Sequence, residues 1–113
     1  MSVADIFNVP SNDQELAAWS TLHMIWHRSM NLAAFEQFNV ALPEFILDPA
    51  DFSSRSGFLQ NHQTMHDNLD ALYGVASYNI IDVDMTDPSQ RAGWFAAHAE
   101  LTRSESNAAG VFA

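Results

Sequence analysis

The sequence of 113 residues contains no cysteine, and it has only four glycines and four prolines. Without cysteine there is no disulfide framework, no thiolate metal site and no cysteine nucleophile. No apolar run approaches the roughly 18 residues of a membrane-spanning helix. The amino terminus also lacks the basic and then apolar pattern of a secretion signal. We therefore expect a soluble, unprocessed chain that does not enter a membrane.

Positive charge is scarce as well. There is no lysine, and fourteen acidic side chains stand against four arginines, which gives a formal net charge of −10. A field of this sign repels a phosphate backbone, so direct nucleic-acid binding is not expected. The acidic residues are spread over helix starts and outer helix faces, which is typical of a solvated surface. The alternative that the net charge leaves open is an acidic, host-directed inhibitor that mimics DNA.

One pattern occurs three times along the chain, an aromatic residue followed four positions later by histidine. The copies are Trp19–His23, Phe58–His62 and Trp94–His98, at intervals of 39 and 36 residues. Such self-similarity indicates one supersecondary unit used three times within a single domain, 1–113. The pseudo-repeats are expected at about 6–40, 45–75 and 81–112.

Capping residues predict where the helix of each copy begins and ends. A residue able to accept hydrogen bonds from a first helical turn stands seven positions before each aromatic residue. Asparagine or glycine, which adopt the left-handed conformation that ends a helix, follows each apolar helical stretch. The starting residues are Asn12, Asp51 and Asp87, and the ending residues are Asn39, Gly74 and Gly110. The predicted helices are 13–38, 52–73 and 88–109.

The expected fold class is mainly α, a three-helix bundle built from a triplicated extended-segment/helix repeat. Trp19, Trp26 and Met30 recur at helical spacing in the first helix, and the other two helices carry matching stripes. Glu105 weakens the stripe of the third helix. Short β-prone runs bounded by proline and aspartate predict extended or β segments before and between the helices. These runs are Ile6-Phe7, Phe45-Ile46-Leu47 and Ile80-Ile81-Asp82-Val83.

The five histidines all fall in the repeated helices. His23 and His27 are one helical turn apart, as are His62 and His66, and this spacing lets one helix offer two imidazoles to a metal ion. If the helices pack about a pseudo-threefold axis, the equivalent rings converge in a site suited to zinc or a related divalent ion. The candidate ligands are His23, His27, His62, His66 and His98, with Asp67 or Glu100 nearby.

A second interpretation needs no cofactor. The histidines lie about 40° and 80° from the centre of the apolar stripe, which predicts rings at the border between core and solvent. Such rings hydrogen-bond a carbonyl or carboxylate and fix the packing of a helix. A pH switch made of five titratable imidazoles is a third possibility.

Known catalytic patterns are missing from the sequence. There is no His-Glu-x-x-His, no Glu-x-x-His pair and no glycine-rich phosphate loop. His98-Ala99-Glu100 matches half of a deaminase signature, but the cysteine half is absent. We therefore expect no enzymatic activity.

A resemblance covers nearly the whole chain. It is carried by Trp19-x3-His23-x3-His27, the segments Phe45–Pro49, Leu59–Asp67 and Ile81–Asp84, and the helix that contains Trp94. With these features the chain resembles small acidic proteins encoded among the virion genes of tailed bacteriophages and prophages. The resemblance implies a structural or interaction protein of the virion, made in the bacterial cytoplasm and contacting other virion proteins. It transfers no catalytic residue.

The first helix is apolar on nearly two faces, because Met24 and Ile25 lie far from the stripe that contains Trp19. A small domain rarely covers two faces of one helix by itself, so we expect a partner or a homo-oligomer. The alternative is that the extended segments cover the second face. We expect exposed side chains off the main stripe, together with the apolar tail of the chain, to make these contacts. The candidate contact residues are Met24, Ile25, Phe35, Phe95 and Phe112.

Overall fold

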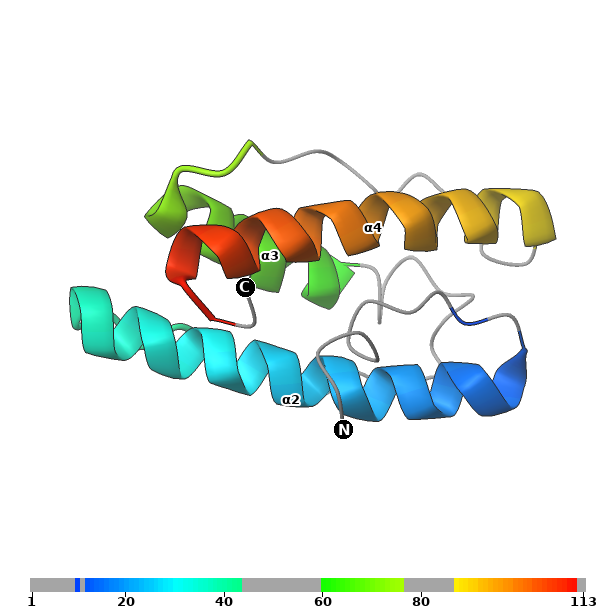
Figure 1. Cartoon of the computed structure of the whole chain (residues 1–113), viewed down its shortest axis with the longest axis horizontal. Coiled ribbons are helices and arrows are strands. Elements are labelled where there is room, and N and C mark those ends of the chain that lie inside the picture. The colour runs from blue at the N-terminus through cyan, green and yellow to red at the C-terminus, as the bar shows by residue number, and fades with distance from the viewer. Residues whose placement is uncertain (1–9, 11, 44–59, 77–86, 112–113) are drawn as a thin grey trace.

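The computed structural model describes residues 10, 12–43, 60–76 and 87–111. These residues form three α-helices and no strand, and the helices are α2 (Asp13–Phe38), α3 (Gln60–Tyr73) and α4 (Pro88–Ala109). Each helix contacts both of the others, and Figure 1 shows α3 and α4 packed along the same side of α2. None of the three has the length and apolarity needed to cross a bilayer. The prediction of a mainly α, three-helix arrangement is confirmed.

Local capping explains the bounds of α2 and α4. At the start of α2, Asn12 Oδ1 accepts a hydrogen bond of 2.8 Å from the backbone N–H of Glu15. At the start of α4, Asp87 Oδ1 accepts one of 2.9 Å from the backbone N–H of Ser89. The residues that end these helices, Asn39 and Gly110, adopt the left-handed conformation at φ values of 56° and 73°. Both helices therefore have the predicted bounds.

The remaining predictions about the repeat are confirmed only at the end of α3. This helix ends at Tyr73, and Gly74 follows in the left-handed conformation, as expected. The predicted helical start at 52 and its cap Asp51 lie outside the described residues, as do the three β-prone runs. The triplicated repeat therefore stays a prediction.

One part of the core is apolar and is called the apolar layer here. Its buried members are Trp26, Met30, Leu69 and Ala109, and Leu42, Tyr73 and Val111 pack against them. The Trp26 indole N–H donates a hydrogen bond of 2.8 Å to Ser106 Oγ, so its polar edge is satisfied in the interior. The apolar layer joins α2 to both other helices, because Leu69 lies on α3 and Ala109 on α4.

A second part of the core is polar, and this differs from the sequence-based expectation. All five histidines are buried, with exposed fractions of 0–2%. The prediction of rings at the border between core and solvent is therefore wrong. Each helix packs against two neighbours, so the buried arc of its surface is wider than its apolar stripe. Glu105, expected to weaken the third helix, is also fully buried in this part of the core.

Candidate metal centre

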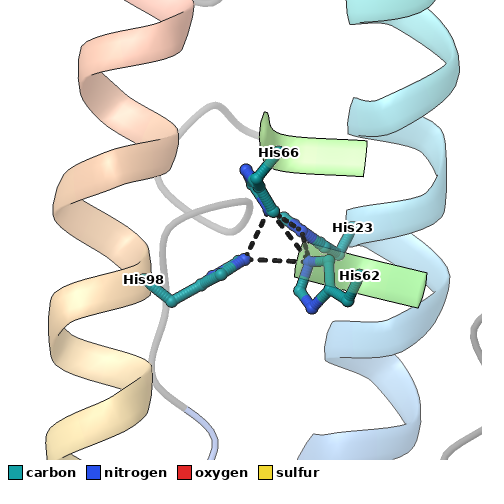
Figure 2. Close-up of side chains that lie close together, drawn as sticks. All are labelled: His23, His62, His66 and His98. Atoms are coloured by element: carbon teal, nitrogen blue, oxygen red, sulfur yellow. Dashed lines mark hydrogen bonds between the residues drawn. The ribbon is translucent and has the colours of Figure 1, made fainter. Parts of the chain in front are cut away.

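Four imidazoles converge between the helices. They form the histidine cluster, which consists of His23 from α2, His62 and His66 from α3, and His98 from α4. Figure 2 shows the four rings turned toward a common point between α2 and α4. One ring nitrogen of each lies within 4.8 Å of the others. The Nε2–Nε2 distances are 2.8 Å for His23–His62, 3.4 Å for His23–His66, 2.9 Å for His62–His66, 3.0 Å for His62–His98 and 2.8 Å for His66–His98.

The recurring sequence pattern explains how the rings are held. In α2 the Trp19 ring stacks on His23, with centroids 4.6 Å apart and planes 15° apart. In α4 the Trp94 ring stacks on His98 in the same way, at 4.7 Å and 14°. Residues four apart lie one turn apart on a helix, so the aromatic residue covers one face of the histidine that follows. The spacing fixes the orientation of both rings.

Further aromatic rings close the cluster off from solvent. Trp26 lies on the other side of His23, with centroids 5.2 Å apart and planes 7° apart. Phe95 packs edge-on against Trp19 at 5.0 Å. The exposed fractions of Trp19, Trp26 and Phe95 are 5%, 0% and 1%. The cluster is therefore enclosed by apolar ring surface.

Hydrogen bonding alone does not account for this geometry. A neutral imidazole has one N–H donor and one acceptor nitrogen, and each ring here presents the same atom, Nε2, to the centre. Four such atoms can form at most two donor–acceptor pairs, yet five of the six Nε2 pairs lie within 3.4 Å. The remaining close contacts have no hydrogen directed along them, and at least one of them sets lone pair against lone pair or hydrogen against hydrogen. A cation held by His23, His62, His66 and His98 would instead let each Nε2 contribute a lone pair to a favourable contact.

The rings are in the protonation state that binds metals. Burial, followed by the repulsion of neighbouring rings, lowers the pKa of His23, His62 and His98 well below the usual 6.5. Burial lowers the pKa of His66 to about 4, against the opposing effect of nearby aspartates. The imidazoles are therefore neutral at pH 7, and neutral imidazole is the form that coordinates a metal ion.

Two buried carboxyl groups adjoin the cluster, and we call Glu105 and Asp70 the carboxyl arm. Glu105 Oε1 lies 2.7 Å from His66 Nδ1, and both side chains are fully buried. Burial raises the pKa of Glu105 to about 8. Burial and the neighbouring Glu105 carboxyl raise the pKa of Asp70 to about 8. Glu105 thus contacts the cluster from the side of the His66 ring opposite the convergence point, and Asp70 lies near Glu105.

The carboxyl arm was not predicted, although the sequence contains a signal for it. Asp70 continues the His62-x3-His66 spacing by one more turn. Glu105 follows His98 by seven residues, which is two turns along the same helix face. The carboxylates that were expected near the site, Asp67 and Glu100, are exposed instead.

His27 is the one candidate ligand that stays outside the cluster. Its ring lies 4.4 Å from the His23 ring, edge to face, and it is fully buried. Neither of its ring nitrogens has a hydrogen-bond partner in the described part of the chain. His66, at the matching place on α3, belongs to the cluster, so the cluster does not follow the threefold pattern of the sequence.

The candidate contact residues differ in their exposure to solvent. Ile25 and Phe35 are exposed, Met24 is half-buried, and Phe112 lies outside the described residues. The expectation that Phe95 is exposed is wrong, because its ring packs between Trp19 and Trp94 with centroid distances of 5.0 and 4.9 Å.

The fold and the cluster together define a mainly α protein with an enclosed four-imidazole centre. Comparisons with protein-family models, with curated proteins and with solved structures give no match. The resemblance to virion proteins therefore stays a prediction.

Proposed function

We propose that this chain is a metal-binding module in which the histidine cluster holds one divalent transition-metal ion, zinc or a close relative. The observation that carries the proposal is the convergence of four Nε2 atoms from three helices, with five of their six pairs 2.8–3.4 Å apart. Imidazole nitrogen is a preferred ligand of zinc, copper, nickel and iron.

The spacing of the nitrogens fits a tetrahedral ion. Zinc–nitrogen bonds of about 2.0–2.1 Å place the four ligand atoms of a tetrahedron about 3.3 Å apart. The observed separations reach that value for one pair and fall a few tenths of an ångström below it for the others. Small outward rotations of the rings accommodate the ion without moving a helix.

The proposed centre is structural. Four protein ligands complete a tetrahedral shell and leave no position for a water molecule or substrate, whereas catalytic zinc sites keep one position open. This supports the prediction that the chain is not an enzyme. Because the ligands come from α2, α3 and α4, the free energy of metal binding adds directly to the stability of the three-helix arrangement.

Metal analysis of protein purified without an affinity tag tests this proposal. We expect about one equivalent of a transition metal per chain, or uptake of one equivalent on adding zinc, together with a rise in the thermal midpoint. Less than about a tenth of an equivalent, with no thermal stabilisation by added zinc, contradicts it.

We also propose a second function, protein–protein contact through α2, as the resemblance to virion components implies. Four large apolar side chains on α2 are exposed: Ile25 at 37%, Leu32 at 58%, Phe35 at 51% and Phe38 at 45%. Three of them recur every third residue near the end of the helix. Apolar side chains grouped in this way are typical of surfaces that bind a partner or a second copy.

The oligomeric state and the composition of intact particles test the second function. We expect wild-type protein to self-associate or to be found in purified virions, and the double variant Leu32→Ser/Phe35→Ser to lose that association. A wild-type protein that stays monomeric at high concentration and is absent from mass spectra of the particles contradicts it.

A further inference from the structure

We propose that the carboxyl arm, Glu105 with Asp70, makes the histidine cluster selective for divalent over monovalent cations. In this arrangement Glu105 is a positioning residue that acts through His66. The inference rests on the proposed metal-binding function. The proposed function names the ligands of the ion, and this inference names the residues that determine which ionic charge is preferred.

The first step is the orientation of His66. A neutral imidazole carries one proton, and Glu105 Oε1 lies 2.7 Å from Nδ1 of this ring. When Nδ1–H donates to the carboxylate, Nε2 is left with a lone pair directed at the convergence point. Carboxylate partners of this kind fix the tautomer and raise the basicity of metal-bound histidines.

The second step is charge. Four neutral imidazoles bring no charge to a dication, and the walls around them are aromatic rings. Opposite charges attract strongly in such an interior because little solvent screens them. Glu105 and Asp70, with exposed fractions of 0% and 3%, are the buried carboxyl groups among the described residues. When a cation occupies the cluster and the two carboxyl groups ionise, their two negative charges can offset the double charge of a dication and overcompensate that of a monovalent ion.

The third step is that no other buried cation among the described residues accompanies the two acids. Two ionised carboxylates in a core are costly unless a positive group accompanies them, and without such a group the acids are held protonated. Three arginines fall in the described part of the chain, Arg28, Arg91 and Arg103, and none of them is buried. A metal ion in the cluster is the positive charge that fits this position.

The test compares charge-removing variants with matched controls. Glu105→Gln keeps an oxygen that can accept a hydrogen bond from His66 Nδ1 but removes the negative charge. Asp70→Asn removes the charge of the second carboxyl group, which lies near Glu105. Glu100→Gln on α4 and Asp67→Asn on α3 are the controls, because they make the same chemical change at exposed positions of the same helices. The affinities for Zn²⁺ and for Ag⁺ are measured by competition with a chromophoric chelator.

We expect Glu105→Gln to weaken Zn²⁺ binding by about 10- to 100-fold, the range typical of outer-shell partners of metal ligands. Asp70→Asn is expected to have a smaller effect, and the two controls none. The affinity for Ag⁺ should fall by a smaller factor, since its charge is half as large. The absorption bands of bound Co²⁺ should shift in Glu105→Gln and return to the wild-type position in Glu105→Asp.

Two results overturn the inference. One is Zn²⁺ affinity unchanged in both Glu105→Gln and Asp70→Asn. The other is an equal loss of Zn²⁺ and Ag⁺ binding, which assigns the arm a purely structural role. If Glu105→Gln does not fold, Asp70→Asn with its control Asp67→Asn decides between these outcomes. Wild-type protein that binds no Zn²⁺ at all refutes the proposed function instead, so the two failures are distinguishable.

Discussion

The two parts of the core are built from the same three helices but are stabilised in different ways. In the apolar layer, Trp26, Met30 and Leu69 are held by burial of apolar surface, and the Trp26 N–H has its partner in Ser106. In the histidine cluster, nitrogen atoms face one another at distances that their own hydrogen bonds cannot satisfy. The apolar layer is complete without a ligand, whereas the cluster has the geometry that the proposed metal ion would satisfy. Burial alone therefore does not show whether a part of the core is stable without a bound ligand.

The largest difference should appear when one ring inside the cluster is compared with one beside it. His62→Ala and His27→Ala remove the same side chain from fully buried positions. We expect His62→Ala to lose stoichiometric zinc binding and with it the metal-dependent stability, which is about 4 kcal/mol when free zinc is 1,000 times its Kd. His27→Ala should lose packing stability only and still bind about one equivalent. Metal analysis measures the zinc content of the two variants, and urea unfolding with and without zinc measures their metal-dependent stability. Equal zinc content in the two variants contradicts the placement of His62 inside the metal site and His27 outside it.

A cavity in the apolar layer should have a large effect that does not depend on metal. Leu69→Ala is expected to lower the free energy of unfolding by about 2–5 kcal/mol, the usual range for a fully buried leucine. Because Leu69 belongs to the other part of the core, the loss should be the same with zinc and with a chelator present. A loss that differs by more than about 1 kcal/mol between these conditions would show that the two parts are coupled.

The stability of the metal-free protein should depend on pH through the cluster and its carboxyl arm. Folding lowers the pKa of the histidines below 6.5, to about 4 for His66, so their contribution is present above pH 6.5 and is lost as the pH falls toward 4. Folding raises the pKa of Asp70 and Glu105 to about 8, so their contribution is present below about pH 4 and is lost as the pH rises toward 8. Below pH 6.5 the two effects on stability oppose each other. The histidine effect is the larger one there, because five histidines outnumber two carboxyl groups.

We therefore expect a net stability maximum near pH 6.5–7, with losses toward both sides. Urea unfolding in chelator at pH 5, 6.5 and 8 measures it. Leu69→Ala should shift the whole curve down without moving the maximum, since no titrating group is removed. Stability that rises steadily from pH 6.5 to pH 5 contradicts the protonation states given for the cluster.

The smallest effect is expected at the start of α2, away from both parts of the core. Asn12 accepts a hydrogen bond from the Glu15 N–H and donates one of 2.8 Å to the Glu15 carboxylate. Asn12→Ala should lower stability by about 1 kcal/mol, as loss of a helix cap usually does. The thermal midpoint should fall slightly, and zinc content should not change. A loss of metal in this variant would show that the cluster depends on the helix end.

Much of the fold was predictable because it depends on short stretches of sequence. The caps Asn12 and Asp87 and the left-handed residues Asn39 and Gly110 set the ends of two helices within one turn of themselves. The helical spacing of Trp26 and Met30 likewise identified buried positions. Interactions of this range can be recognised in a single sequence.

The site was less predictable because it depends on how the helices face one another. The spacing of the histidines identified all four members of the cluster as candidates, but it did not separate His66, which joins the cluster, from His27, which does not. Glu105 was interpreted as an interruption of an apolar stripe, since its partner His66 is 39 residues away. Phe95 was placed on an outer face because a single-helix stripe does not include the contact with Trp19 on α2. Contacts between helices decide all three cases.

The central claim is that four imidazole nitrogens surround one metal ion, and X-ray absorption at the metal edge tests it most directly. In tag-free protein loaded with one equivalent of zinc, we predict a first shell of four nitrogen atoms at about 2.0 Å with the outer-shell pattern of imidazole rings. A first shell made mainly of oxygen atoms, or fewer than three imidazoles at the metal, would contradict the claim.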